Sequence, residues 1–563
     1  MPLKPIYGKA PLTSLKGIAL RPGQVHMNQE KLTAVYDLLC QHGKDCVAAW
    51  EPAFRAACIL NQKPLETPVS QWIHACADAQ AEDGALPVAV ESAVDAACAM
   101  MAVYEYRPER AVLEKLMRWC AWAGANWAQL MACADVRVRP ANLMALLCQL
   151  YRITGKKGLI RLCGQLRQDS MDWSSVLHTF SVQRPMKRMI RYAELESGMA
   201  DENHHEAGFY TRQYLTCHGE TLADGARAAL MSSVYSGNGQ EASAAAAGWE
   251  KISRWHGAVC GGVTADGTLG GLSPACAVDA ASLGAWAEAF AAQVQLDESA
   301  AIGDALERIV YNGLPAAVLE GGLVPYQRVN GLRANCGTRD CYDAKTGEDD
   351  ALHALCRVAR GWTAAMQSAV CATAKGAQMN LYLPGVYALS LGETAVRMTV
   401  SGHDGAYEIR LSMKQDAEAS IAFRAPAWTD DGCVTVNDEG GYEAKKNTYL
   451  TLERRWHDGD VIRVEFARSV QTTEGYHQSV SVRYGEHVMV CPVTEADWAY
   501  ALTGVEARDG QVFAMVKRVP GWKCAHGVPG DMPVLPETTG EAFEVELKPY
   551  ADAPCRLAAF PKA

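Results

Sequence analysis

The sequence lacks any apolar run long enough to span a bilayer, which takes roughly 18 to 20 residues. Its first stretch also lacks the continuous apolar segment and small-residue cleavage site of a secretory signal. We therefore expect a cytoplasmic protein that is not bound to a membrane, in which most of the 20 cysteines are reduced thiols. Many of them lie on apolar helical faces, where a thiol acts as a small buried hydrophobe.

Clusters of basic residues are also missing. The 563 residues include 53 Lys and Arg against 64 Asp and Glu, a net charge of −11, and the basic side chains are scattered. This balance argues against nucleic acid as a partner and favours a neutral or cationic small ligand. The hydrophobic fraction of 49% is ample for burial, and a chain of this length is expected to form two to four domains.

The first half shows no repeated signature at the period of about 34 to 47 residues that marks the common helical solenoids. From residue 31 to about residue 300, apolar residues instead recur at helical spacing in one segment after another. Gly and Asp between these segments indicate short connections and antiparallel neighbours. We predict an α/α toroid, a barrel of helical hairpins, in preference to a solenoid. Its loops would gather on one face and form a pocket.

The pattern changes near residue 379 to short alternating segments separated by Gly, Asp and Asn turns. Such segments are typical of antiparallel β-sandwiches. A second set of alternating segments begins near residue 470. We therefore predict a helical α/α barrel domain at residues 1–378, a β-sandwich domain at 379–470 and a second β-sandwich domain at 471–563.

Three groups of carboxylates stand out in the Gly-rich loops between His256 and Trp362. Asp266 precedes a glycine, Asp279 precedes a helical segment, and Asp349 is followed by Asp350. Hydrolysis of a glycosidic bond uses one carboxyl group as acid and a second as base or nucleophile. The alternatives are an ordinary Asp-Gly turn for Asp266 and a helix cap for Asp279.

Several other side chains could contact a sugar. His218 and Glu220 lie in the loop that opens a helical segment, and Asp350 could also bind substrate. Aromatic rings stack on sugar faces, so we add Tyr326 and Trp362. His256 opens the same Gly-rich stretch and completes the predicted substrate-binding set.

One spacing could mark a metal site. Cys336, Cys341, His353 and Cys356 follow the pattern C-x4-C-x11-H-x2-C, and three thiols with an imidazole could hold zinc. The spacing matches no common zinc finger or ribbon. In a chain this rich in cysteine, chance clustering is the alternative.

Runs in both halves of the chain resemble glycoside hydrolase family 127, the β-L-arabinofuranosidases, and its near relatives. The helical half contributes LTCHGETLADGARAAL, RWHGAVCGGVTADGTLGGLSP and ALERIVYNGLPAAV, and the first sandwich contributes IAFRAPAW, VTVND and LERRWHDGDVIRVEF. The order of these runs covers most of the chain. The resemblance implies an α/α barrel followed by β-sandwich domains, and a hydrolase that acts on a terminal sugar.

The family site implied by this resemblance joins a Glu general acid to a zinc held by a Glu-x-Cys pair and a Cys-Cys pair, and one thiolate attacks the sugar. Here the acid loop reads TADGTL, with Asp266 as its carboxylate, and the Glu-x-Cys pair reads DAA from Asp279. The Cys-Cys position reads HALC, which leaves Cys356 as the nearby thiol and His353 as a stand-in ligand. Zinc is therefore only a possible cofactor. We expect Asp266 to act as the acid and Asp279 as the base or orienting group, with one of Asp349 and Asp350 as the alternative to Asp279.

Together these observations predict a glycoside hydrolase that cleaves a terminal sugar from a short oligosaccharide or glycoside. A non-catalytic carbohydrate-binding relative and a lyase on the same scaffold are the alternatives. The substrate is the expected partner, without nucleic acid or membrane, and the sequence leaves a homo-oligomer open. Fold-level analogy cannot choose among these activities.

Overall fold

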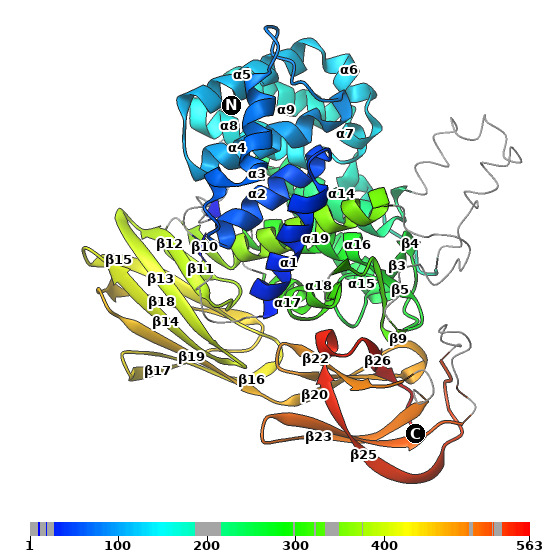
Figure 1. The fold of residues 1–563 in the computed structure, drawn as a ribbon. Coiled ribbons are helices and arrows are strands. Elements are labelled where there is room, and N and C mark those ends of the chain that lie inside the picture. Colours follow the sequence, from blue (N-terminus) through cyan, green and yellow to red (C-terminus); the bar gives the residue numbers. More distant parts are fainter. Residues whose placement is uncertain are drawn as a thin grey trace, which may run out of the picture.

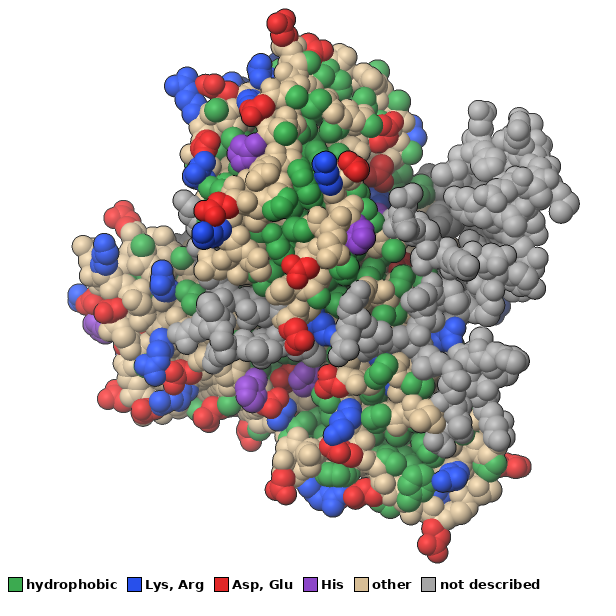
Figure 2. Space-filling model, viewed as in Figure 1, with side chains coloured by type: hydrophobic (Ala, Val, Ile, Leu, Met, Phe, Trp, Pro, Cys, Tyr) green, Lys and Arg blue, Asp and Glu red, His purple; other side chains and the backbone are tan. Residues whose placement is uncertain are grey.

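The computed structural model describes residues 10–11, 18–19, 27–185, 215–296, 299–319, 322–332, 348–373, 375–494, 499–520, 522 and 532–563. Helices occupy the N-terminal part and antiparallel sheets occupy the C-terminal part (Figure 1). This arrangement confirms the predicted α/α toroid followed by β domains. On the face shown in Figure 2, basic side chains are interspersed with acidic ones. None of the described helices is both long and apolar enough to cross a membrane.

Six helices of the described chain form a closed inner ring. Each packs on the next in the order α2, α4, α8, α14, α16, α19, and α19 packs on α2 to close it. The ring consists of α2 (Trp50–Ile59), α4 (Ala93–Tyr106), α8 (Ala141–Thr154), α14 (Gly219–Ser236), α16 (Ala280–Val294) and α19 (Glu348–Ser368).

An outer layer of amphipathic helices covers this ring. Helix α9, for example, buries Leu159, Cys163 and Leu166 at helical spacing and packs on α8 and α14. The outer helices are α1 (Met27–His42), α3 (Pro68–Asp78), α5 (Arg110–Ala125), α9 (Lys157–Asp169), α15 (Gly239–His256) and α17 (Ala300–Arg308). Shorter helical pieces are α6 (Trp127–Ala132), α7 (Ala134–Val138), α10 (Trp173–His178), the π-helix η5 (Ile309–Gly313) and α18 (Leu314–Ala316).

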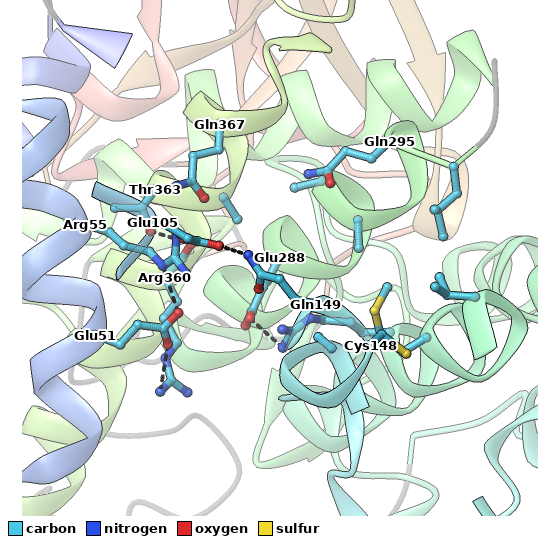
Figure 3. A pocket seen from close by; sticks show the side chains of 18 of the residues that line it. Glu51, Arg55, Glu105, Cys148, Gln149, Glu288, Gln295, Arg360, Thr363 and Gln367 are labelled. Atoms are coloured by element: carbon cyan, nitrogen blue, oxygen red, sulfur yellow. Dashed lines mark hydrogen bonds and ion pairs between the residues drawn. The ribbon is translucent and has the colours of Figure 1, made fainter. Parts of the chain in front are cut away.

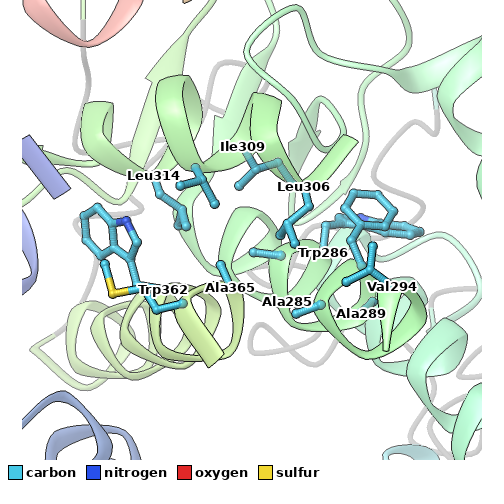
Figure 4. Packing of buried hydrophobic residues seen from close by; sticks show 14 of the residues in the cluster. Ala285, Trp286, Ala289, Val294, Leu306, Ile309, Leu314, Trp362 and Ala365 are labelled. Carbon is cyan, nitrogen blue, oxygen red and sulfur yellow. The ribbon is translucent and has the colours of Figure 1, made fainter. Parts of the chain in front are cut away.

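Small residues let α16 and α19 approach closely. A Cβ on Gly284 would lie 2.2 Å from the carbonyl oxygen of Arg357, and one on Gly361 would lie 2.7 Å from the carbonyl oxygen of Gly284. Larger apolar side chains of α16 and α19, including Trp286 and Trp362, fill the core beside this crossing (Figure 4). This close contact fixes how the acidic and basic residues of the two helices face each other.

The middle β domain consists of two packed sheets. Their strand orders are β1-β10-β11-β15-β18 and β17-β16-β19-β14-β13-β12-β2, and the short N-terminal strands β1 (Ala10–Pro11) and β2 (Ile18–Ala19) join their edges. Alternating burial along β13 and β14 matches the sequence pattern. The other strands are β10 (Val370–Thr373), β11 (Gly376–Met379), β12 (Gly385–Leu391), β13 (Thr394–His403), β14 (Ala406–Met413), β15 (Ala417–Ala425), β16 (Thr429–Val436), β17 (Glu439–Glu443), β18 (Thr448–Trp456) and β19 (Val461–Arg468).

The C-terminal strands form a nine-stranded sheet that also takes in β9 (Asn330–Leu332) from the helical domain. Strand β26 pairs with β9, and the fully buried Arg556 donates hydrogen bonds to backbone carbonyls at Arg328, Tyr550 and Ala553. This module therefore packs directly on the helical domain. Its strands are β20 (Val470–Glu474), β21 (Val480–Tyr484), β22 (His487–Pro492), β23 (Tyr500–Arg508), β24 (Gln511–Arg518), β25 (Thr539–Pro549), β26 (Cys555–Leu557) and β27 (Ala559–Phe560).

Candidate active site

The N-terminal ends of the inner helices meet around a cavity of about 230 Å³. His353, in the first turns of α19, lines this cavity, and Glu220 in the first turn of α14 contacts His353 and the lining residues Arg139 and Arg357. His218 and Asp279, at the starts of α14 and α16, are not among the lining residues. We call this cavity the N-terminal cavity. Its charged lining residues are Glu91, Asp95, Asp135, Arg139, Asp224, Arg227, His353, Arg357 and Arg360.

Glu220 forms the centre of a cluster of charges beside this cavity. Its side chain is 4% exposed, and its Oε1 lies 3.1 Å from Nη1 of Arg139 and 2.9 Å from Nε of Arg357. Nε2 of His353 lies 2.9 and 3.0 Å from the two carboxylate oxygens. Although burial favours the neutral acid, Arg357 and Arg139 hold the pKa of Glu220 well below its usual range.

The same contact acts in the opposite direction on His353. Burial disfavours the imidazolium, but the hydrogen bond and negative charge of Glu220 outweigh it and raise the pKa of His353. The side chain is 46% exposed and lines the N-terminal cavity. His353 is therefore an accessible ionisable group held in place by a buried carboxylate.

Further ion pairs continue from this cluster along the axis of the ring. Arg357 bonds Asp224 at 2.5 Å and lies 3.4 Å from Glu288. Toward the C-terminal ends of the inner helices a second pocket opens, where Arg360, Glu51, Arg55 and Glu105 form successive ion pairs (Figure 3). The toroid interior is thus polar along its axis.

Asp279 caps α16. Its Oδ1 accepts a hydrogen bond from the backbone N–H of Ala281 at 2.8 Å, and its Oδ2 accepts one from the Ser282 hydroxyl at 3.3 Å. Burial, with the nearby charge of Glu220, raises the pKa of Asp279 to about 7. Strand β5 (Ala277–Asp279) pairs with β8 (Tyr326–Arg328), which places Asp279 opposite Tyr326 in the register. Asp279 therefore acts as the N-cap of α16, which is the alternative role considered for it from the sequence.

The hairpin that carries Asp266 packs against the start of α14. Strands β3 (Ala265–Asp266) and β4 (Thr268–Leu269) pair, and the N–H of Gly219 donates to the carbonyl of Gly267 at 2.9 Å. The hairpin therefore reaches the same end of the toroid as Glu220. The side chains of Asp266, Asp349 and Asp350 lie outside the described part of the structure.

His218 is the N-cap of α14. Its Nδ1 accepts a hydrogen bond from the backbone N–H of Thr221 at 3.4 Å and lies 3.0 Å from the Thr221 hydroxyl. Burial lowers the pKa of His218 to about 4, so the ring is neutral at physiological pH. The residue thus sits at the site as an uncharged imidazole.

None of the described residues predicted to bind substrate is among those that line the cavity; they are His218, Glu220, His256, Tyr326 and Trp362. Two of them lie in the interior. His256 is fully buried, accepts a hydrogen bond at Nδ1 from the N–H of Gly271 and donates from Nε2 to the carbonyl of Val182, each at 3.0 Å. Trp362 is 0% exposed and packs in the core (Figure 4). Helical phase explains this correction: Trp362 falls on the face of α19 that is turned toward the core, while His353 and Arg357 face the cavity.

Sequence reasoning missed Arg139, Asp224 and Arg357. Each lies in a helical or loop segment without a catalytic motif, and each gains its role only from partners on other helices. The available signal was charge on otherwise apolar inner helices, such as Asp224 within LADGARAAL. A charged residue on a helix that is otherwise buried normally has a partner of opposite charge on a neighbouring element.

The described residues do not fit a zinc ion at this site. Cys356 is buried, and the pKa of its thiol is raised by a hydrogen bond with Cys46 and by burial. Nε2 of His353 is engaged with Glu220. Within the described ranges, these residues and Asp279 do not form a cluster of three donors close enough to share a metal. Cys336 and Cys341 lie outside those ranges, so we derive no step through zinc.

Comparisons with known proteins support the family resemblance. Residues 376–468 match the family model of the GH127 β-L-arabinofuranosidase middle domain. A structure described as a glycoside hydrolase is 13% identical, with a TM-score of 0.71 and full coverage of both chains. No curated protein matches this sequence significantly.

Two further solved structures share the fold. A GH127 β-L-arabinofuranosidase from Geobacillus stearothermophilus T6 is 16% identical, with a TM-score of 0.64 over 96% of this chain and 93% of that one. The GH127 β-arabinofuranosidase BT3674 is 15% identical, with a TM-score of 0.66 over 100% and 99%. Residues 376–468 thus match the GH127 middle domain and the chain folds as these structures do, which confirms the predicted resemblance to glycoside hydrolase family 127.

Proposed function

We propose that the protein is a glycoside hydrolase that releases a terminal sugar from a short oligosaccharide or glycoside bound in the N-terminal cavity. The observation that carries this proposal is the polar lining of this cavity, where acids and arginines from several inner helices meet and the buried Nε of Arg360 has no hydrogen-bond partner. Oδ2 of Asp224 and Nε of Arg357 are engaged in ion pairs, at 3.3 Å with Arg139 and at 2.9 Å with Glu220. Buried polar groups are nearly always bonded, so the unpaired Arg360 nitrogen and the charged lining suit a ligand rich in hydroxyl groups.

The paired-carboxylate mechanism assigns Asp266 as the acid that protonates the leaving oxygen. Its hairpin is held against Gly219 and His218, at the same end of the toroid as the cavity. Asp279 is the second carboxyl group, as base or orienting group, and its pKa of about 7 lets it exchange a proton at neutral pH. His353, fixed by Glu220, would donate a hydrogen bond to a substrate hydroxyl.

A non-catalytic carbohydrate-binding protein is the second candidate. It is favoured by the state of the described carboxylates: both oxygens of Asp279 accept hydrogen bonds from the first turn of α16, and Glu220 is engaged by Arg139, Arg357 and His353. A carboxylate engaged in this way is a poor nucleophile. Binding through the same cavity would need no free carboxylate.

Hydrolysis of a panel of chromogenic furanosides and pyranosides, including β-L-arabinofuranoside, tests the proposal. Under a paired-carboxylate mechanism, activity persists in the presence of a zinc chelator. Calorimetric titration with the corresponding free sugars tests the binding protein, since binding without turnover of any glycoside would favour it. A product with a new double bond, seen by ultraviolet absorbance, would indicate a lyase.

A further inference from the structure

A second cluster of ionisable side chains lies outside the N-terminal cavity, where three parts of the fold meet. It joins the turn between β13 and β14, which carries Asp404, to the turn between β21 and β22, which carries Glu486. The π-helix η5 of the helical domain packs against β22. Asp404, Glu486 and His487 each offer one ligand atom, and these atoms lie within 4.8 Å of one another.

Two atoms of this cluster are left without partners. Glu486 is 2% exposed, and its Oε2 has no hydrogen-bond partner. The buried Nδ1 of His487 also has none, while its Nε2 lies 3.7 Å from Oε1 of Glu486. An unpaired buried carboxylate is costly, and buried charges are normally paired with a cation or coordinate a metal. The site thus offers a carboxylate oxygen and a ring nitrogen, which can both bind to a cation.

The third member has contacts of its own. Oδ1 of Asp404 lies 2.7 Å from Nη1 of Arg468, and its Oδ2 lies 3.1 Å from Nδ1 of the exposed His403. Arg468 therefore partly balances the negative charge of Asp404 at the exposed side of the cluster. The neighbouring His403 contact is exposed to solvent and can open to let Oδ2 bind a cation.

The helical domain holds the β21–β22 turn in place. The side-chain amide of Asn312 donates to the carbonyl of Glu486 at 3.1 Å, and its oxygen accepts from the N–H of Val488 at 2.8 Å. The ring of Tyr311 meets His487 edge to face at 5.7 Å between centroids. Because backbone and ring are both fixed, the donor atoms are positioned before any ligand arrives.

We propose that Asp404, Glu486 and His487 bind one divalent transition-metal cation of the Zn²⁺ type. Two carboxylate oxygens with one imidazole nitrogen suit such a cation, and water would complete its coordination. The ion would link the middle β domain to the C-terminal sheet beside η5. This site is separate from the carbohydrate site and needs no cysteine.

Metal content of the full-length protein tests this proposal. Protein stripped with a chelator is dialysed against Zn²⁺ and then against metal-free buffer, and zinc per chain is measured by plasma mass spectrometry. Glu486→Gln and His487→Gln should each hold one equivalent less than the original protein. His457→Gln is the matched control, since His457 pairs with Asp416 at 3.0 Å on the exposed surface and should not change the count.

Thermal unfolding gives a second readout. Added Zn²⁺ should raise the Tm of the original protein and of His457→Gln, but not that of Glu486→Gln, because a ligand stabilises the state that binds it. Zinc held by cysteines elsewhere would be common to all variants and would cancel in the difference. Asp404→Asn replaces His487→Gln if that variant does not fold. Equal zinc content in the original protein and Glu486→Gln, or no zinc in the original protein, would overturn the proposal.

Discussion

His353 and Glu220 meet across the inner ring, with the imidazole Nε2 2.9 and 3.0 Å from the two carboxylate oxygens. The pair joins the first turn of α14 to the first turns of α19. It raises the pKa of the histidine, while the arginines around the carboxylate lower the pKa of the glutamate.

Replacing Glu220 by Gln should destabilise the protein strongly. The change removes the buried carboxylate that Arg139 and the buried Arg357 share, while both arginines keep Asp224 as a partner, and breaking a buried ion pair costs about 3–5 kcal/mol. The pKa of His353 should fall at the same time, as seen by NMR titration. Glu114→Gln, which removes an exposed pair with Arg110, should change the free energy of unfolding in urea by less than about 1 kcal/mol. Equal losses in the two variants would contradict this account.

Asp279 should make stability depend on pH. Its pKa of about 7 in the folded protein lies above the value of about 3.9 in an unfolded chain. The folded state therefore holds the proton more tightly, so this contribution is complete below pH 4 and is lost as the pH rises through 7. Asp279→Asn keeps a good helix cap and should lose less stability than the original protein between pH 5 and pH 8. Parallel pH profiles from urea unfolding would show that the carboxyl group has no such effect.

The contact between α16 and α19 should not tolerate a side chain at Gly284. A Cβ there would lie 2.2 Å from a backbone oxygen of α19, so overpacking should cost about 1–3 kcal/mol or more in Gly284→Ala. Gly158→Ala in α9 is the matched control, since a Cβ there meets nothing within 4 Å. That control should stabilise by about 0.5–1 kcal/mol. Denaturant unfolding that gave both variants the same sign would refute the close crossing.

Cys46 should be unusually reactive for a thiol of this protein. A hydrogen bond from Cys356, opposed by burial, lowers the pKa of Cys46 to about 6, whereas burial raises the pKa of the similarly exposed Cys40. At neutral pH iodoacetamide should therefore alkylate Cys46 faster than Cys40, as followed by peptide mass spectrometry, because the thiolate is the reacting form. Cys356→Ala should lower the rate at which iodoacetamide alkylates Cys46, because the hydrogen bond that lowers the pKa of Cys46 is lost. A rate for Cys46 that did not respond to that change would rule out the thiol pair as the cause.

The fold could be predicted largely from local patterns. Helical periodicity up to residue 300 and alternation after residue 379 are properties of short segments, and each segment buries the face that its own pattern makes apolar. The closure of six helices into a ring depends on contacts between distant segments. The short N-terminal strands β1 and β2, which complete sheets of the middle domain, were likewise not evident from the sequence.

The candidate site was predictable only where a residue acts through its own segment. His218 and Asp279 cap the helices that follow them, and a position at the start of a helix can be predicted from the local sequence. Arg357 and Asp224 gain their roles from partners on other helices, so no local signal marks them. Trp362 was assigned to the site because of its type, but its helical phase places it in the core.

The rate of glycoside cleavage by the original protein and by Asp266→Asn tests whether the protein is a hydrolase that uses Asp266 as its acid. Both are assayed on the chromogenic panel with and without chelator, after circular dichroism has shown that the variant folds. We expect cleavage of at least one glycoside that persists with chelator, and a loss of about 10²–10⁴-fold in Asp266→Asn, as is usual when a general acid is removed. No cleavage of any glycoside, or equal rates for the two proteins, would contradict a hydrolase that uses Asp266 and would favour the carbohydrate-binding alternative.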